Sequence, residues 1–590
     1  MLFLVAYIFR SNETEVPREI NSFTKGLPSR GSVDVKLHIA FMYSAVRCTL
    51  FVLCLPIMVF GQDDRANQID AIFQSWNNAS SPGAAVSVVH EGRLIFEKGY
   101  GLANLEYNVP IQPDTIFHVA SVSKQFTAMA LVLLEQDHKL SIDDDVHKYL
   151  PELPDYGHPV KIRNLLQHTS GIRDQWQTLA LAGWSFEDVI TQDQILRMLF
   201  RQKELNFLPG TEHLYSNGGY TLAAEIVTRV SGQPFPQFCA DRIFKPLGMT
   251  HTHFHQNLHQ LVKNRAYSYS GMKEAYEISP LNYANVGATS LFTTATDLTK
   301  WLDNFREPVI GGKRAVARMT ERAVLSSGKT IDYALGLSLG KHRGLPTISH
   351  AGGDAGFRSY VCWYPDQQLG IAVVSNLGSF NPVATADKVA AVYLDSKMIP
   401  DPPPVKRTFI TVNPVILRTL AGKYPLPQIG QTLVVVVEGG KLLAAGPIQP
   451  PLEMKAVSSS SFYVESLSAA IDFTPAPNSG MRVKITQPGA VNEGVRTNDP
   501  PKTATDFRVY TGIYWSEELE TQYSFSVNQG KLIATHAHHG VITLTPKAMD
   551  SFSSDQWFMA DVNFMRDKDG HVSAVNLGGG RIRGIRFVKK

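Results

Sequence analysis

The chain has 590 residues and a nearly balanced charge, with 56 Lys and Arg against 53 Asp and Glu and a formal net charge of +3. This balance, without a long basic run interleaved with aromatic residues, gives no indication of nucleic-acid binding. Hydrophobic residues make up 44% and charged residues 18% of the sequence, which is typical of globular proteins and excludes the disordered and fibrous classes. The length allows about three to four domains.

Residues 1–61 have the pattern of a leader. A short basic start at Met42 is followed by the almost continuously apolar residues 48–60. Val59 and Gly61 then place compact side chains at the positions that signal peptidase reads. We therefore expect a signal peptide from Met42 to Gly61, with Met42 as the hypothetical true start, and a secreted or periplasmic protein. A short membrane anchor is the alternative, although this apolar run is short for a transmembrane span.

The next segment changes from strand to helix patterns and back. Residues 85–89 and 93–96 are short apolar runs joined by a Glu91-Gly92 turn, which is typical of a β-hairpin. A mostly helical stretch from 121 to about 301 is followed by β-like runs at 333–339, 360–364 and 370–375, and by a helix at 384–394. Strands at both ends predict an α+β fold, in which one antiparallel sheet is built from distant pieces beside an inserted helical lobe. A crevice between sheet and lobe would be a natural substrate site.

A proline-rich linker at residues 400–404 marks a domain boundary. Beyond it the sequence repeats with a period of 90 residues: the matched pairs are Gly422/Gly512, Tyr424/Tyr514, Leu442/Leu532 and Phe462/Phe552. Both copies contain alternating short strands and glycine turns, which predicts two small all-β barrels or sandwiches. We therefore expect three domains after the leader: the α+β domain at 62–399, a first β-rich repeat at 405–487 and a second β-rich repeat at 505–590.

Ser121 and Lys124 are the first candidate catalytic pair. They lie three positions apart before the apolar run from Phe126 to Leu134, so a helix would place the hydroxyl and the amine on one face. An amine so placed can activate a serine nucleophile without a histidine. The spacing alone is weak, because Ser-x-x-Lys also occurs elsewhere in this chain and serine is a favoured helix cap.

Two later motifs strengthen the interpretation through their order and setting. Tyr215-Ser216-Asn217 follows Pro209-Gly210 and precedes a helix pattern, and His350-Ala351-Gly352-Gly353 precedes two apolar strands. Each motif has chance counterparts in the same chain, such as Tyr283-Ala284-Asn285. The chosen motifs, however, lie on loops or element ends from which a side chain can reach the crevice.

Together these motifs resemble the serine beta-lactamase and penicillin-binding superfamily, in its class C-like branch. The resemblance covers about residues 65–395. It is based on Ser121-Val-Ser-Lys124, Leu165-Leu-Gln-His-Thr-Ser-Gly171, Tyr215-Ser-Asn217, Pro246-Leu-Gly-Met249 and His350-Ala-Gly352, in that order.

The resemblance implies a serine hydrolase that works through an acyl-enzyme. Ser121 would attack a carbonyl carbon, and Lys124 and Tyr215 would move the protons; which of the two is the formal base stays open. Asn217 would orient Lys124 and a substrate amide, and Gln175 would contact the acyl-side amide. Backbone N–H groups of Ser121 and Gly353, with Gly352 beside them, would hold the oxyanion. No cofactor and no metal are implied.

His350 stands where beta-lactamases and carboxypeptidases usually have the lysine of Lys-Thr-Gly. A histidine with its ordinary pKa of ~6.5 is mostly neutral at pH 7, so the fixed positive charge for a substrate carboxylate is lost. Histidine here resembles D-aminopeptidases and related esterases, some of which also have two C-terminal barrels. We therefore expect action on amides or esters, such as D-amino-acid peptides or small esters, with the cell wall as one source of such substrates.

Two alternative functions and two alternative sites stay open from the sequence. The chain could be a genuine class C-like beta-lactamase or D-Ala-D-Ala carboxypeptidase, or a non-catalytic protein that binds cell-wall material or beta-lactams. The nucleophile-elbow pattern Gly336-Leu-Ser338-Leu-Gly340 is a weaker candidate, because a turn and not a helix follows it. His251, His253 and His255 alternate as a zinc site would require, but no carboxylate is adjacent. No stable membrane span is expected, and the oligomeric state cannot be read from the sequence.

Overall fold

The computed structural model describes residues 64–272, 275–400, 407–426, 431–445, 452–477, 480–487, 490–496 and 506–590. The predicted signal peptide, Met42 to Gly61, lies outside the described residues. In the part of the chain that is described, no helix is long and apolar enough to span a membrane.

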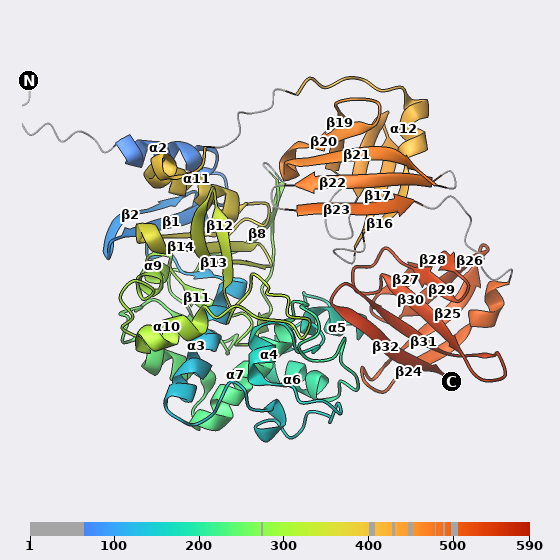
Figure 1. Cartoon of the computed structure of the whole chain (residues 1–590), viewed down its shortest axis with the longest axis horizontal. Coiled ribbons are helices and arrows are strands. Elements are labelled where there is room, and N and C mark those ends of the chain that lie inside the picture. Colours follow the sequence, from blue (N-terminus) through green and yellow to red (C-terminus); the bar gives the residue numbers. More distant parts are fainter. Residues whose placement is uncertain are drawn as a thin grey trace, which may run out of the picture. The chain divides into compact units, whose positions relative to one another are not determined.

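A six-stranded antiparallel sheet forms the centre of the first domain (Figure 1). Its order is β12 (Ser338–His342), β13 (Leu345–Asp354), β14 (Phe357–Tyr364), β15 (Leu369–Ser375), β1 (Ala84–His90) and β2 (Arg93–Tyr100). The N-terminal hairpin is thus joined to the late strands through β1 and β15, which pair from Ala84↔Ser375 to His90↔Leu369. The predicted α+β fold with one sheet from distant segments is confirmed.

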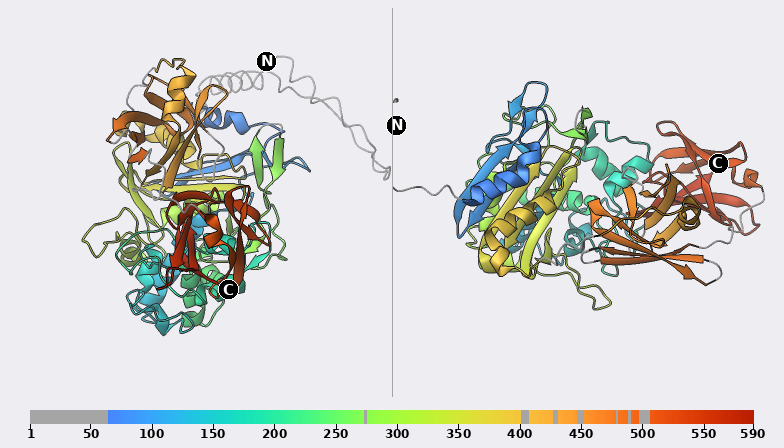
Figure 2. Two further views of the ribbon diagram at one scale, coloured as in Figure 1. Left: turned by 90° about the vertical axis from the view of Figure 1, so that its right-hand side faces the viewer. Right: turned by 90° about the horizontal axis from the view of Figure 1, so that it is seen from above.

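Helices cover both faces of this sheet. On one face α2 (Asp64–Phe73) and α11 (Pro382–Leu394) lie side by side (Figure 2), and on the other face α9 (Ala295–Asp303) packs against β1 and β15. Strands β1 and β15 lie between these helical layers and are buried almost throughout. Burial on both sides explains why the sequence of these strands is continuously apolar and does not alternate.

The helical lobe is built around α3 (Ser123–Gln136), whose first twelve residues are all buried. Helix α7 (Asn217–Ser231) packs against α3. The other helices of the domain are α4 (Ile162–Leu166), α5 (Gln175–Leu181), α6 (Gln192–Phe200), α7 (Asn217–Ser231), α8 (Phe235–Cys239) and α10 (Gly312–Met319). The short strands are β3 (Leu102–Asn104), β4 (Val109–Pro110), β5 (Phe117–His118), β6 (Ile190–Thr191), β7 (His253–Phe254), β8 (Tyr269–Met272), β9 (Ala275–Ile278), β10 (Tyr283–Ala284) and β11 (Leu291–Thr293). A helix buried on all sides requires the uniformly apolar sequence seen after Lys124.

The two β-rich repeats have the same plan. The first contains α12 (Pro414–Leu420) and strands β16 (Gly422–Leu426), β17 (Gln431–Glu438), β18 (Lys441–Ala445), β19 (Leu452–Ala456), β20 (Ser461–Val464), β21 (Ala469–Ala476), β22 (Gly480–Gln487) and β23 (Ala490–Arg496). The second contains β24 (Gly512–Ser516), β25 (Thr521–Asn528), β26 (Lys531–His536), β27 (Gly540–Thr543), β28 (Thr545–Ala548), β29 (Ser551–Ser553), β30 (Asp561–Arg566), β31 (Val572–Gly579) and β32 (Ile582–Lys589).

Equivalent tyrosines in the two repeats are buried in the same way and make the same hydrogen bond. Tyr424 and Tyr514 are both fully buried, and each hydroxyl donates a hydrogen bond to the carbonyl four residues earlier, Leu420 at 2.7 Å and Tyr510 at 2.9 Å. In the first repeat β16 lies against β23, which brings the two ends of the sheet together in a barrel. The 90-residue sequence period therefore reflects repeated structure.

The first repeat extends beyond the boundary expected at residue 487. Strand β23 pairs with β22 from Gln487↔Ala490 to Met481↔Arg496, so it belongs to the same sheet. Cys239 and Cys362 are free and buried.

Candidate active site

Ser121 lies in a single 3₁₀ turn, Ala120–Val122, immediately before α3. Ala120 adopts a φ of +47°, a left-handed conformation that is uncommon for a residue with a side chain. The hydroxyl of Ser123 donates to the Ala120 carbonyl at 2.5 Å and accepts from Leu291 N–H at 3.1 Å, which holds this turn in place. Backbone strain of this kind persists only where surrounding contacts support it.

The amine of Lys124 has three neighbours within hydrogen-bond distance. Its Nζ lies 3.0 Å from Ser121 Oγ, 2.8 Å from Asn217 Oδ1 and 2.8 Å from the Ala288 carbonyl. The amide and carbonyl oxygens can only accept, whereas the serine hydroxyl can also donate. A neutral Lys124 amine can therefore use its two N–H groups on Asn217 and Ala288 and direct its lone pair at the Ser121 hydroxyl.

Burial favours this neutral form. Lys124 is completely buried, which lowers the pKa of its amine from 10.5 to about 7, although the carboxylates of Asp354 and Asp174 act in the opposite direction. A substantial fraction of the protein thus carries an uncharged amine next to Ser121 at neutral pH. The geometry and the protonation state both suit a general base.

The ring of Tyr215 lies close to the Lys124 amine. Lys124 Nζ is 5.0 Å from the centre of the Tyr215 ring, and the His168 ring packs on Tyr215 with ring centres 4.0 Å apart. Burial raises the pKa of Tyr215 above its ordinary value of 10, while a hydrogen bond with Ser121 lowers it. The net upward shift keeps the phenol protonated at neutral pH, which suits a proton donor better than a phenolate base.

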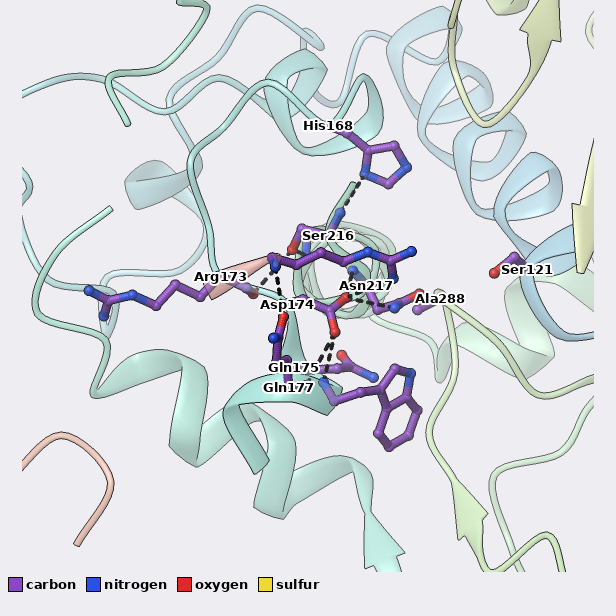
Figure 3. Close-up of polar contacts among 12 residues, drawn as sticks. Ser121, His168, Arg173, Asp174, Gln175, Gln177, Ser216, Asn217 and Ala288 are labelled. Carbon is purple, nitrogen blue, oxygen red and sulfur yellow. Dashed lines mark hydrogen bonds and ion pairs between the residues drawn. The ribbon is translucent and has the colours of Figure 1, made fainter. Parts of the chain in front are cut away.

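Asp174 holds the Tyr215-Ser216-Asn217 segment in place through hydrogen bonds to Asn217 (Figure 3). Its Oδ2 accepts from the backbone N–H of Asn217 at 2.9 Å and from the Asn217 side-chain amide at 2.7 Å. Its Oδ1 accepts from the N–H groups of Trp176 and Gln177, which caps α5. Because the Asn217 amide nitrogen is committed to Asp174, its oxygen is turned toward Lys124.

His350 belongs to a chain of hydrogen bonds between buried, uncharged groups. Ser216 N–H donates to His168 Nδ1 at 3.1 Å, His168 Nε2 lies 3.2 Å from the Tyr333 hydroxyl, and that hydroxyl lies 2.9 Å from His350 Nε2. His350 Nδ1 lies 2.6 Å from the carbonyl of Ala351, so it carries the hydrogen of the neutral ring. Burial and the charge of Lys124 lower the pKa of His350 to about 3. His350 therefore offers no positive charge to a substrate.

Strand β13 brings Gly352 and Gly353 to the serine turn. A side chain at Gly352 would collide with the Val119 carbonyl at 2.3 Å and would lie 3.1 Å from Ser121 N. Only glycine fits this close approach of two backbones. The roles of the Ser121 and Gly353 N–H groups as oxyanion donors stay predictions that the approach of β13 favours.

Gln175 is buried at the start of α5. Its Oε1 accepts from the Thr221 hydroxyl at 2.6 Å, and its Nε2 is buried without a partner among the described residues. The predicted contact with an acyl-side amide stays a prediction. Direct contact would require the side chain to move, because none of Gln175 is exposed.

A buried carboxylate balances the charge of the site. Asp354 accepts hydrogen bonds from Thr289 Oγ1 and from His118 Nε2, the latter at 2.9 Å. Burial raises the pKa of Asp354, but the contacts with His118 and Thr289 and the charge of Lys124 hold it below the ordinary value. Asp354 stays ionised and stabilises positive charge on the lysine.

Sequence reasoning missed Asp174, Tyr333, Asp354 and Arg581, which all contribute to this region. Asp174 could have been found as a helix cap, since an aspartate directly before a helix pattern is a common start signal. Tyr333 and Asp354 have no local signal. Arg581 follows Gly578-Gly579-Gly580, and a run of three glycines before a strand can indicate close backbone approach.

The other candidate sites lack the arrangement that their chemistry requires. Ser338 begins strand β12 and is not followed by a helix, which agrees with the prediction against a nucleophile elbow. Within the described ranges, no group of three His, Cys, Asp or Glu side chains could hold a metal ion. A cavity of about 190 Å³ lies where α5 meets the second repeat and is lined by aromatic side chains, including Trp176, Phe186, Trp557 and Phe558.

Comparisons with known proteins agree with the resemblance inferred from the motifs. A family model described as Beta-lactamase matches residues 69–395. Penicillin-binding protein 4* of Bacillus subtilis (strain 168) is 26% identical over 456 residues, which cover 74% of this chain and 100% of that protein. D-aminopeptidase of Gluconobacter oxydans (strain 621H) is 28% identical over 310 residues, which cover 52% of this chain but only 58% of the relative.

The fold is also found in a solved structure. The octameric penicillin-binding protein homologue from Pyrococcus abyssi has a TM-score of 0.52 and 24% sequence identity to this chain. The similarity covers 74% of this chain and 100% of that chain. It supports the arrangement of sheet, helical lobe and β-rich segment described above.

Proposed function

This chain belongs to the Beta-lactamase family and is a serine hydrolase, and on that basis we propose that it cleaves amides or esters, such as D-amino-acid peptides or small esters, through an acyl-enzyme on Ser121. The observation that carries the proposal is the 3.0 Å separation of Lys124 Nζ and Ser121 Oγ, with a lysine pKa of about 7. The D-aminopeptidase relative supports the substrate class.

Acylation begins with Lys124 as the base. Its neutral amine takes the proton of the Ser121 hydroxyl while Oγ forms a bond to the substrate carbonyl carbon. The oxygen of the resulting tetrahedral intermediate is stabilised by the N–H groups of Ser121 and Gly353. Asn217 and the Ala288 carbonyl, both 2.8 Å from Nζ, stabilise the lysine once it is charged.

Collapse of the intermediate uses Tyr215 as the acid. The bond from the carbonyl carbon to the leaving nitrogen or oxygen breaks, and the leaving group takes the proton of the Tyr215 hydroxyl. The Lys124 ammonium then returns a proton to the phenolate, which restores the neutral amine and the phenol. Water then attacks the ester on Ser121 by the same proton transfers in reverse order.

The neutral third motif argues against classical beta-lactam substrates. Beta-lactams carry a carboxylate that a fixed cation at the third motif would attract, and a histidine with a pKa of about 3 is uncharged at neutral pH. A class C-like beta-lactamase or carboxypeptidase is therefore the second candidate.

We also propose that the protein is secreted or periplasmic through the segment from Met42 to Gly61.

Four chromogenic substrates test the proposal: a D-alanine anilide, an L-alanine anilide, a short-chain nitrophenyl ester and nitrocefin. We expect turnover of the ester or the D-anilide well above that of nitrocefin, and loss of all turnover in Ser121→Ala. Efficient nitrocefin hydrolysis would favour the second candidate. Equal activity of Ser121→Ala and wild type would reject catalysis at this site. A mature N-terminus at about Gln62, found by N-terminal sequencing, would support export.

A further inference from the structure

A hairpin of the second repeat lies beside the candidate active site. It is formed by β31 and β32, and Arg581 lies in the turn between them. The guanidinium carbon of Arg581 is 4.8 Å from the centre of the Tyr215 ring. Its Nη1 is 3.8 Å from Asp174 Oδ2. The most C-terminal domain thus places a permanent positive charge next to the predicted proton donor.

Backbone hydrogen bonds hold this hairpin on the helical lobe. Gln177 accepts from Arg581 N–H at 2.7 Å and donates to the Gly579 carbonyl at 2.6 Å. Asn206 donates to the Arg581 carbonyl at 2.9 Å and accepts from Arg583 N–H at 2.8 Å. Since all four bonds use main-chain atoms of the hairpin, the side chain of Arg581 is not needed to dock it.

A buried ion pair adds to the docking. Arg173 binds Glu518 of the second repeat, and its Nη2 donates to the Arg583 carbonyl at 3.1 Å. Arg173 lies directly before Asp174, so the same short segment fixes both the hairpin and Asn217. The position of Arg581 is therefore coupled to the position of the site residues.

The guanidinium of Arg581 is available to a ligand. Its side chain is 48% exposed, and the 3.8 Å ion pair with Asp174 is too long for a hydrogen bond. Asp174 Oδ2 already accepts two hydrogen bonds from Asn217. Arg583, two residues on, differs: its guanidinium donates to both carboxylate oxygens of Glu212, at 3.2 and 3.0 Å.

We propose that Arg581 determines substrate specificity by binding a carboxylate in the acyl part of the substrate. Arginine presents paired N–H donors that match a carboxylate, and its charge does not depend on pH in the physiological range. His350 is neutral and offers no charge to a carboxylate, whereas Arg581 places a positive charge beside Tyr215 and Asp174. The inference rests on the proposed function and narrows it to acyl groups that carry an acidic substituent.

The position of Arg581 explains why the acyl part is favoured. The guanidinium lies near Asp174, which holds the Asn217 amide and immediately precedes Gln175. The family resemblance assigns Gln175 to the substrate amide on the acyl side, and assigns Asn217 to Lys124 and a substrate amide. A cation at this place also repels substrates with a free ammonium group there, so simple D-aminopeptidase substrates should be poorer than acidic ones.

Two anilides of equal length test the proposal on the full-length protein. Glutaryl 4-nitroanilide carries a terminal carboxylate, and valeryl 4-nitroanilide has a methyl group in its place. We expect wild type to prefer the glutaryl compound at least tenfold in kcat/KM. Rates are compared well above pH 7, where the Lys124 amine is uncharged with or without Arg581. There Arg581→Gln should lower the ratio of kcat/KM for the glutaryl compound over the valeryl compound at least tenfold, while Arg581→Lys keeps part of the preference.

Arg583→Gln is the matched control, because it removes the same charge from the same hairpin but from a guanidinium already bound to Glu212. It should change neither substrate more than twofold. An equal loss on both substrates in Arg581→Gln, or an equal effect of the two variants, would overturn the inference. A preference for the valeryl amide of 4-aminobenzoate over glutaryl 4-nitroanilide would overturn the assignment to the acyl part.

A binding measurement separates this inference from the proposed function. Calorimetry with Ser121→Ala compares the monoanilide of glutaric acid with valeranilide, and then repeats the titration in Ser121→Ala with Arg581→Gln. Tighter binding of the acid that depends on Arg581 supports the inference even if wild type turns over neither anilides nor esters, a result that would instead reject the proposed reaction. Equal binding of both anilides would overturn the inference whatever the turnover.

Discussion

The amine nitrogen of Lys124 lies 3.0 Å from the hydroxyl oxygen of Ser121, and burial brings the pKa of that amine to about 7. The two other neighbours of the amine, Asn217 Oδ1 and the Ala288 carbonyl, can only accept hydrogen bonds. Ser121 is therefore the group positioned to give its proton to the lysine lone pair. This relationship supports the proposal that Lys124 is the base and that Tyr215, whose pKa is raised, is the acid.

The pH dependence of kcat/KM should report the lysine. Below pH 7 the amine is charged and has no lone pair, so kcat/KM rises about tenfold per pH unit and levels off above about pH 7. Arg581→Gln should move this rise to higher pH, because the charge of Arg581 adds to burial in lowering the pKa of Lys124. The check is a pH–rate profile with an ester substrate. A rate that falls as pH increases through 7 would contradict a neutral-lysine base.

Tyr215→Phe should affect anilides more than nitrophenyl esters. An anilide nitrogen must be protonated as it leaves, whereas a nitrophenolate leaves without a proton. Loss of a general acid typically costs about 10²–10⁴-fold, so we expect at least a hundredfold loss of kcat/KM, which excludes deacylation, on the D-anilide and a much smaller loss of kcat/KM on the ester. Steady-state kinetics on both substrates check this. Equal losses would show that Tyr215 acts before the leaving group departs.

Tyr333→Phe should destabilise the fold and lower activity together. Its hydroxyl lies between His168 Nε2 and His350 Nε2, and both rings are buried. Removing it leaves a buried donor and a buried acceptor unpaired, at about 1–3 kcal/mol each in the free energy of unfolding. Urea unfolding measures the loss. Tyr107→Phe, at a side chain that is 78% exposed, is the control and should be neutral.

Asp174→Asn should lower kcat as well as stability. The new amide would face the Asn217 amide nitrogen, which now donates to Asp174 at 2.7 Å, and would turn Asn217 away from Lys124. Thr294→Ala is the matched control, because Thr294 caps α9 by accepting from Asp297 N–H at 3.0 Å. Thr294→Ala should cost roughly 1 kcal/mol of folding free energy. Asp174→Asn keeps a capping oxygen, since asparagine caps helices as well as aspartate does, and should cost about 1–3 kcal/mol because it leaves buried amide N–H groups facing each other. Only Asp174→Asn should reduce kcat, by tenfold or more; unchanged kcat would make Asp174 a helix cap alone.

The sequence determined those features that depend on neighbouring residues. The all-round apolar pattern after Lys124 predicts a buried helix, and three-residue spacing places its amine beside Ser121 whatever the rest of the fold does. The 90-residue repeat predicts two copies of one β-rich unit, because Tyr424 and Tyr514 must each be buried with a bonded hydroxyl. The order of motifs likewise predicts which loops meet.

Only the tertiary structure decided what surrounds the serine and lysine. Tyr333, Asp174 and Arg581 come from segments far apart in the chain, and each reaches the site through long-range contacts that have no local pattern. Even the end of the first repeat at Arg496 depends on strand pairing and not on composition. The charge next to Tyr215 comes from another domain, because hydrogen bonds from Gln177 and Asn206 to backbone atoms can dock a hairpin of almost any sequence.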